Sequence, residues 1–262
     1  MPTDTTLLKV NNIQIEIIDR GQGQPLLFLH PGIGIDPKAP VLDRLAAHGR
    51  LIAPSRPGFG NSEQPRAFTT VDDLAYFYLD LFDQLDLRDV TVVGVSLGGW
   101  IAAEMAVKST QRISRLVLAN TVGIKVGTRE TRDIADIFAK TENDLNTLVY
   151  FNPEIAARDY KTMADADLRI VARNREATAR YAWSPYMHNP KLKGRLHRIR
   201  IPTLFLWGDA DRVLSENYGR AFCAAIAGAR FETIERAGHY PHIEQTDVFA
   251  GKVISFIEGQ VP

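Results

Sequence analysis

One junction restricts the fold of this chain more than any other stretch. The run VTVVGV at 90–95 is rich in β-branched residues, and it leads directly to Ser96, which has a glycine two residues away on each side. Small and apolar residues with helical spacing follow at once, at 98–109. The pattern predicts a buried strand that turns abruptly into a helix, as in domains where helices connect the strands of one sheet.

Other apolar runs along the chain have the same character. Continuous runs of this length are typical of strands buried on both faces of a parallel sheet. In chain order they read PLLFLH, RLIAPS, VTVVGVS, RLVLAN and PTLFLWG. Helical patterns at 70–87, 98–109, 215–228 and 246–259 alternate with several of them. The alternation predicts an α/β fold with a mostly parallel central sheet flanked by helices.

The alternation stops between residue 121 and about residue 201, where no run typical of a strand occurs. Four segments in this region have helical or helix–turn patterns, at 129–140, 141–151, 152–163 and 165–183. We therefore predict a helical cap at 122–199, inserted after the sixth strand. The core would then consist of residues 1–121 and 200–262.

The junction at Ser96 also has a chemical meaning, because residues 94–98 match the pattern G-x-S-x-G. In such a turn the serine hydroxyl projects from the carboxyl edge of the sheet. The N–H groups that begin the next helix can stabilise an anion there. The alternative interpretation is a tight turn that merely needs small residues. The strand before Ser96 and the helix after it favour a nucleophile.

A serine hydroxyl needs a base, and histidine is the usual base near neutral pH. Of the six histidines, His239 follows a strand-like run and a glycine, which places it in a loop after a late strand. His242, three residues further on, is its local competitor. His30 ends an early strand, where we expect it to shape its loop. We predict that His239 is the base.

The histidine in turn needs a carboxylate that orients it and stabilises its charged form. Asp209 and Asp211 both follow the buried run PTLFLWG, at the sheet edge where catalytic groups gather. Asp211 is our choice and Asp209 the alternative. The run RLVLAN ends in Asn120, which offers no acid. The chain order Ser96, Asp211, His239 is the order found in α/β-hydrolases.

An oxyanion hole completes this machinery. We expect the N–H of Leu97, directly after the nucleophile, to be one donor. The second donor should come from the loop HPGIGID after an early strand. Pro31 has no N–H, so the donor there is Gly32 or Ile33.

Taken together, these motifs resemble the α/β-hydrolase superfamily, in particular its capped, serine esterase-like branch, over nearly the whole chain. FLHPGIG is similar to the oxyanion loop of that family, SRPGFGNSEQP to its P-G-x-G-x-S loop, and GVSLGG to its nucleophile elbow. LWGDADRV and AGHYPHIEQTDVF are similar to its acid and histidine segments, which supports Asp211 and His239. Pro31 and Arg56 depart from the usual pattern.

The resemblance also separates subclasses. Haloalkane dehalogenases and epoxide hydrolases use an aspartate nucleophile, and the serine at position 96 argues against both. Hydrolases of aromatic ring-cleavage products share the serine triad and the cap, and they often carry tryptophan after the catalytic histidine. Tyr240 stands there in this chain.

Substrate choice should lie between the cap and the core, where aromatic and apolar side chains can line a pocket. The residues we expect in that role are Trp100, Phe138, Tyr181, Trp183, Tyr186, Met187 and Tyr240. The cap arginines have the pattern of a solvated helical face. A carboxylate-bearing substrate would give one of them a role.

Three functions are compatible with the sequence. The first is hydrolysis of a carboxylic ester, lactone or thioester through an acyl-enzyme. The second is hydrolysis of a carbon–carbon bond in ring-cleavage diketones on the same triad. The third is a non-catalytic receptor for a small molecule.

Composition restricts the partners. Lysine plus arginine equals aspartate plus glutamate, at 31 each, so we expect no nucleic acid as partner. The small ester-like molecule that we expect as partner follows from the triad motifs and the family resemblance. The N-terminal residues do not resemble a signal peptide and no apolar run could span a bilayer, so we expect a cytoplasmic protein with no membrane partner. The histidine pair in HYPH lacks a third ligand, and we expect neither metal nor cofactor. The sequence leaves monomer and homodimer open.

Overall fold

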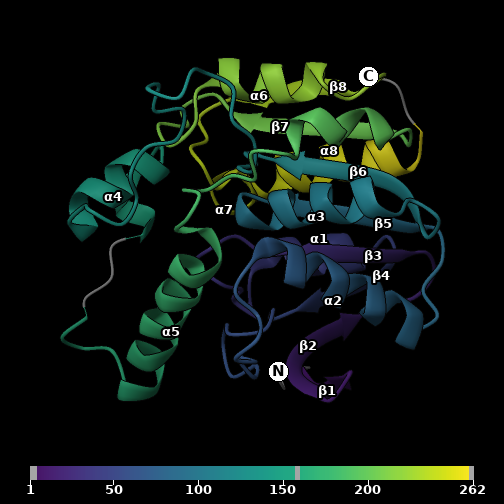
Figure 1. Cartoon of the computed structure of the whole chain (residues 1–262). Helices are drawn as coiled ribbons and strands as arrows, with labels where there is room; N and C mark the ends of the chain where they lie inside the picture. The colour runs from purple at the N-terminus through teal and green to yellow at the C-terminus, as the bar shows by residue number, and fades with distance from the viewer. Residues whose placement is uncertain (1–4, 157–159, 260–262) are drawn as a thin grey trace.

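The computed structural model describes residues 5–156 and 160–259 and has an eight-stranded sheet at its centre (Figure 1). The strand order is β1-β2-β4-β3-β5-β6-β7-β8. Strands β3 to β8 pair in parallel, and β1 and β2 add an antiparallel edge. The strands are β1 (Thr5–Val10), β2 (Ile13–Arg20), β3 (Pro25–Leu29), β4 (Arg50–Pro54), β5 (Val90–Val95), β6 (Ile113–Ala119), β7 (Thr203–Gly208) and β8 (Arg230–Ile234). The predicted mostly parallel sheet is confirmed.

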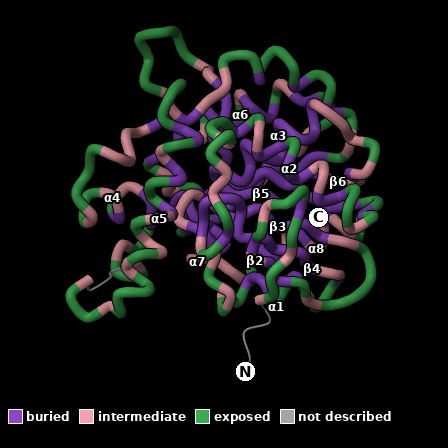
Figure 2. Tube along the Cα trace, turned by 60° about the horizontal axis from the view of Figure 1, so that its bottom comes forward, coloured by how far each residue is buried: buried purple, intermediate pink, exposed green. Residues whose placement is uncertain are grey.

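The most apolar runs form the inner strands. Every residue of β5 and of β7 is buried, because helices cover both faces of the sheet at these positions. Figure 2 shows the buried chain gathered in the sheet and its flanking helices, while the region around α4 and α5 is largely exposed or half-buried. The core therefore fixes the sheet edge on which the candidate site lies.

Helices flank the sheet, with α2 packed against α3 and α1 packed against α8. Their bounds are α1 (Pro40–Ala46), α2 (Val71–Gln84), α3 (Leu97–Lys108), α6 (Glu216–Ala224), α7 (Pro241–Glu244) and α8 (Thr246–Ile257). Helix α2 begins with a capping box, in which the Thr70 hydroxyl accepts the N–H of Asp73 and the Asp73 carboxylate accepts the N–H of Thr70. No helix within the described ranges has the length and hydropathy needed to cross a bilayer.

The chain between β6 and β7 forms helices beyond the edge of the sheet (Figure 1). They are α4 (Glu142–Val149), the 3₁₀ helix η1 (Pro153–Ala156) and α5 (Asp165–Ala182). The 3₁₀ helix η2 (Lys193–Arg198) follows them and packs against α3 instead. In the described part of this segment no sheet strand occurs. The predicted helix at 152–163 lies partly outside the described residues, which omit 157–159. The exact division of the chain at 122 and 199 stays a prediction.

The predicted helix at 129–140 is wrong, because this segment has only turns and one isolated bridge, from Ile134 to Leu214. Two aspartates explain the difference. The Asp133 carboxylate accepts the N–H groups of Val126 and Gly127. The Asp136 carboxylate accepts two further N–H groups, from residues 138 and 139. Such local side-chain bonds compete with helix formation.

Candidate active site

Ser96 occupies a strained turn between β5, which ends at Val95, and α3, which begins at Leu97. Its φ and ψ are 53° and −116°, a conformation that residues with a side chain rarely adopt. A Cβ atom at Gly98 would lie 2.0 Å from the carbonyl oxygen of Leu29. At Gly94 it would lie 2.5 Å from the carbonyl oxygen of Gly98. The two glycines thus allow the backbone packing that places a serine at this edge.

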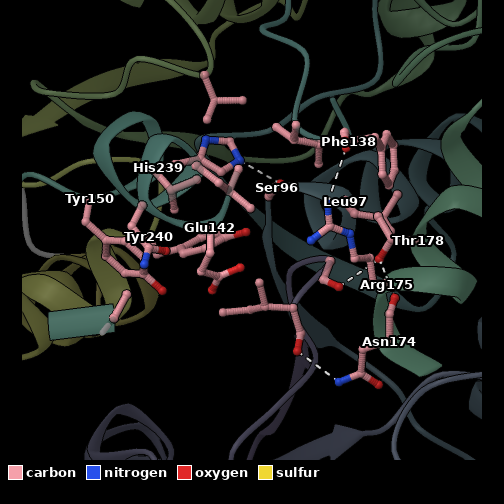
Figure 3. A pocket seen from close by; sticks show the side chains of 18 of the residues that line it. Ser96, Leu97, Phe138, Glu142, Tyr150, Asn174, Arg175, Thr178, His239 and Tyr240 are labelled. Atoms are coloured by element: carbon pink, nitrogen blue, oxygen red, sulfur yellow. Dashed lines mark hydrogen bonds between the residues drawn. The ribbon is translucent and has the colours of Figure 1, made fainter. Parts of the chain in front are cut away.

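Two side chains from distant parts of the sequence form a hydrogen-bonded series with Ser96. Its Oγ lies 2.8 Å from Nε2 of His239, and Nδ1 of His239 lies 2.8 Å from Oδ2 of Asp211 (Figure 3). A carboxylate can only accept, so Nδ1 carries the proton and Nε2 is free to accept the serine hydroxyl. Ser96 and His239 are 7% and 3% exposed. The structure thus brings together the three residues that the sequence predicted for the triad.

Asp211 is held by four donors. Oδ1 accepts the N–H groups of Val213 (2.8 Å) and Leu214 (3.0 Å), and Oδ2 accepts the side-chain amide of Asn120 (2.7 Å) besides His239. The Asn120 Oδ1 accepts the N–H of Gly208 at 3.1 Å, which fixes the amide. This orienting contact of Asn120 was not predicted from the sequence, where Asn120 stands only as a residue that offers no acid. Its place at the end of β6, beside β7, was the available signal for this contact.

Asp209, the alternative acid, is exposed and does not contact His239 in the structure. Its Oδ1 is 3.4 Å from the N–H of Ala237, in the turn before the histidine, so its contact is with the backbone. The competitor His242 is buried among the rings of Phe28, Tyr240 and Phe249. Burial, followed by the nearby His239, lowers the pKa of His242 to about 3, so it is neutral near pH 7.

His30 and Arg56 form a buried pair below the oxyanion loop, both 0% exposed. Nε2 of His30 accepts the backbone N–H of Arg56 at 3.2 Å, so Nδ1 carries the proton and donates to the carbonyl of Pro31 at 2.8 Å. Burial, and then the Arg56 charge, hold the pKa of His30 well below its usual value. His30 therefore shapes its loop, as expected.

A cavity opens directly over Ser96 and His239 (Figure 3). Leu97, Gly32 and Ile33, the candidate oxyanion residues, all line it. Leu97 is the first residue of α3, and its N–H has no acceptor within the helix. The remaining lining is mostly apolar and comes largely from the cap. It consists of Val122, Ile134, Ile137, Phe138, Glu142, Leu145, Asn146, Val149, Tyr150, Ala156, Tyr160, Val171, Asn174, Arg175, Thr178, Met187, Val213 and Tyr240.

Phe138, Met187 and Tyr240 thus line the cavity as predicted, and the other four predicted pocket residues do not. Trp100 is buried along α3, where its indole N–H donates to Glu104 at 3.2 Å. The Tyr181 hydroxyl donates to the carbonyl of Pro57 at 3.1 Å.

The remaining two lie toward the outside of the cap. The Tyr186 hydroxyl donates to the carbonyl of Ala135 at 2.8 Å, and Trp183 is 60% exposed, with its ring edge-on to Phe138. Hydrogen bonds thus hold Trp100, Tyr181 and Tyr186 outside the cavity lining, while Trp183 is mostly exposed.

Polar side chains of the cap also line the cavity, and apart from one arginine none of them was predicted from the sequence. Arg175 borders the cavity and donates to the carbonyl of Phe138 at 3.3 Å. Glu142 also borders it and accepts the hydroxyl of Tyr160 at 2.7 Å. In the sequence Arg175 looks like the other arginines of a solvated helix face, because nothing local shows which side of α5 faces the core.

The site offers no cluster for a metal: within residues 5–156 and 160–259, no three His, Cys, Asp or Glu side chains are placed to share one. The arrangement is a hydroxyl, an imidazole and a carboxylate in series, with backbone N–H groups nearby. Such a series can transfer an acyl group from a bound carbonyl compound.

Comparisons with known proteins agree with this fold. A family model described as "Alpha/beta hydrolase family" matches residues 26–252. An uncharacterised protein of Mycobacterium tuberculosis is 29% identical, over 92% of this chain and 77% of that protein. A 2-hydroxy-6-oxo-2,4-heptadienoate hydrolase of Pseudomonas putida is 25% identical, over 97% and 96% of the two chains. A solved meta-cleavage product hydrolase from Pseudomonas fluorescens has the same fold, with a TM-score of 0.77 at 19% identity over 99% of both chains.

Proposed function

The chain belongs to the alpha/beta hydrolase family, and on that premise we propose that it is a serine hydrolase of a carboxylic ester, lactone or thioester. One observation carries the proposal: the unbroken series from Ser96 through His239 to Asp211, with 2.8 Å at each contact, beneath a largely apolar cavity. An apolar lining suits the acyl or alcohol part of such a substrate.

In the proposed reaction, the Ser96 hydroxyl attacks the carbonyl carbon while Nε2 of His239 takes its proton. Asp211 stabilises the imidazolium that forms. His239 then gives the proton to the leaving alcohol or thiol, and the C–O or C–S bond breaks to leave an acyl-enzyme. Water, deprotonated by the same histidine, releases the acid and restores Ser96. No step needs a cofactor.

The negative charge of the tetrahedral intermediate falls on the former carbonyl oxygen. The N–H of Leu97 and that of Gly32 or Ile33 are the proposed donors to it. Losing one such donor typically costs roughly 3–4 kcal/mol of transition-state stabilisation.

A second candidate function is hydrolysis of a carbon–carbon bond in a ring-cleavage diketone. Two observations favour it: the relatives named as hydrolases of such compounds, and Arg175. Arg175 is the only arginine among the described residues that line the cavity, and a carboxylate-bearing substrate would meet it there. Tyr240, where ring-cleavage hydrolases often carry tryptophan, weighs toward the ester reaction.

Two substrate panels distinguish these functions. One holds aryl esters of increasing acyl length with lactones, and the other holds ring-cleavage dienoates. We expect turnover of short or medium esters and a loss of about 10⁴-fold or more in Ser96→Ala. Faster turnover of the dienoates would establish the second candidate. Tight binding of a small molecule without turnover of any compound would indicate a receptor.

A further inference from the structure

The oxyanion loop is held from two sides. On the core side, the carbonyl of Pro31 accepts Nδ1–H of His30 at 2.8 Å and the N–H of Gly34 at 3.2 Å. On the cap side, the carbonyl of Gly32 lies 2.7 Å from the hydroxyl of Thr178, whose single proton is shared with the carbonyl of Asn174 on its own helix at 2.8 Å. The next carbonyl, of Ile33, accepts the side-chain amide of another α5 residue at 2.9 Å. Two consecutive carbonyls of this loop thus depend on a cap helix.

The second α5 residue is Asn174, and its contacts fix its orientation. Its Nδ2 donates to Ile33, and its Oδ1 accepts the N–H of Gly60 at 2.9 Å, so the amide is used at both ends. Asn174 and Thr178 are 6% and 4% exposed, and lie one turn apart on the same face of α5. Figure 3 shows both side chains turned from α5 toward the loop.

The fit between helix and loop is close. A Cβ at Gly34, where φ is +93°, would lie 2.3 Å from Nδ2 of Asn174. At Gly32 it would lie 3.1 Å from both Oγ1 and Cγ2 of Thr178. Gly34 is therefore needed where α5 approaches the loop, and a side chain at Gly32 would require Thr178 to shift.

The peptide plane connects these contacts to catalysis. Each peptide group is planar and trans, so holding a carbonyl also sets the direction of the N–H that follows it. The core contacts to Pro31 orient the N–H of Gly32, and the Thr178 contact orients the N–H of Ile33. Glycine alone restricts its own backbone little, so Gly32 keeps one conformation only while both flanking peptides are held.

We propose that Asn174 and Thr178 are positioning residues that hold the oxyanion loop in its active shape from the cap. The proposal rests on the function proposed above. The cap helix α5 then does more than enclose the substrate: it orients backbone donors that it does not itself supply. Neither residue reacts with the substrate: Thr178 acts through the peptide between Gly32 and Ile33, and Asn174 holds the carbonyl of Ile33 that follows it.

Thr178→Val tests this, because valine keeps the shape of threonine and removes the hydroxyl. We expect kcat on an aryl ester to fall about tenfold with KM within about twofold, less than the 10²–10³-fold typical of deleting a donor. The affinity for a trifluoromethyl ketone, which forms a tetrahedral adduct with the nucleophile, should fall by the same factor as kcat. Thr178→Ser should retain both values.

Asn174→Asp serves as the second variant, because it keeps the acceptor for Gly60 and loses the donor to Ile33. Glu176→Ala, on the exposed face of α5, is the matched control and should behave as wild type. The proposal is overturned if both test variants bind the ketone and turn over ester like wild type. It is also overturned if Thr178→Ser loses as much as Thr178→Val, since the methyl group would then be what matters.

Ser96→Ala, measured in parallel, separates this proposal from the function on which it rests. If Ser96→Ala keeps full turnover and ketone affinity, the proposed function fails. If Ser96→Ala is inactive while the α5 variants equal wild type, only the positioning role fails.

Discussion

The two cap helices contact different halves of the proposed machinery, and by different means. Helix α4 meets the acid and histidine loops with the backbone carbonyls at its C-terminal end. Thr147 accepts Nη1 of Arg212 at 2.8 Å, Leu148 accepts its N–H at 3.3 Å, and Val149 accepts the N–H of His239 at 2.6 Å. Helix α5 meets the oxyanion loop with the side chains of its inner face.

The difference shows two ways in which a cap can become part of an active site. The last carbonyls of a helix have no partner inside it, so α4 needs donors, and the loops that carry Asp211 and His239 supply them. Most of these are backbone groups, which a substitution at the same residue does not remove. The α5 contacts come from two side chains and can be removed one at a time. Single substitutions should therefore remove the α5 contacts to the oxyanion loop but leave most of the α4 contacts in place.

The largest effect is expected for His239→Ala. The substitution removes the base but leaves the backbone N–H that donates to Val149, so docking of α4 should persist while kcat/KM falls by about 10⁴-fold or more. Ester kinetics and thermal unfolding check the two parts separately. A variant that lost its fold together with its activity would show that docking and chemistry at this loop are not separable.

Acid should lower the free energy of unfolding through His242, which lies three residues after His239. Folded His242 has a pKa of about 3, while unfolded histidine binds its proton near pH 6.5. Between those values the unfolded state holds more protons, so the free energy of unfolding falls as pH falls, by about 1.4 kcal/mol per pH unit for this group. His30, with its lowered pKa, acts in the same direction.

His242→Phe should therefore make stability less dependent on pH below 6, and urea unfolding at several pH values measures the slope. The aromatic cage of Phe28, Tyr240 and Phe249 can accept a phenyl ring of similar size. His197→Asn, at an exposed site, should leave the slope as it is. An unchanged slope in His242→Phe would mean that this ring is not the proton-linked group.

The smallest effect is expected for Arg212→Gln. Its guanidinium donates to the carbonyls of Thr147 and Tyr150 near the negative end of the α4 dipole, but the residue is exposed. The unfolding free energy should fall by about 1 kcal/mol, with kcat/KM reduced a few-fold. Arg212→Lys should recover part of both. A loss as large as that of His239→Ala would mean that α4 controls the triad more directly than the comparison implies.

Sequence alone could predict much of the part of the candidate site that lies on the core sheet. The elbow at Ser96 is local, since its strand, glycines and helix are consecutive. Asp211 and His239 follow strands whose carboxyl ends must share one edge. The strand pairing then brings them into contact without any further information.

The residues that the cap contributes to the candidate site could not be predicted as fully. Asn174, Arg175 and Thr178 stand in one amphipathic helix, and which of them meet the loop depends on how α5 is rotated against a core distant in sequence. The prediction for Trp100 was wrong for a related reason. Its position one turn after Ser96 suggested the pocket, but its indole N–H donates to Glu104 on the same helix. Aromatic content predicted a lining, and three-dimensional packing decided which rings form it.

The most direct test of the account is the site of covalent labelling by a fluorophosphonate, read by peptide mass spectrometry on the intact enzyme. The account predicts one label per chain, on Ser96, with its rate strongly reduced in His239→Ala and only moderately reduced in Thr178→Val. Labelling at another residue, or labelling of Ser96 at an unchanged rate without His239, would contradict it.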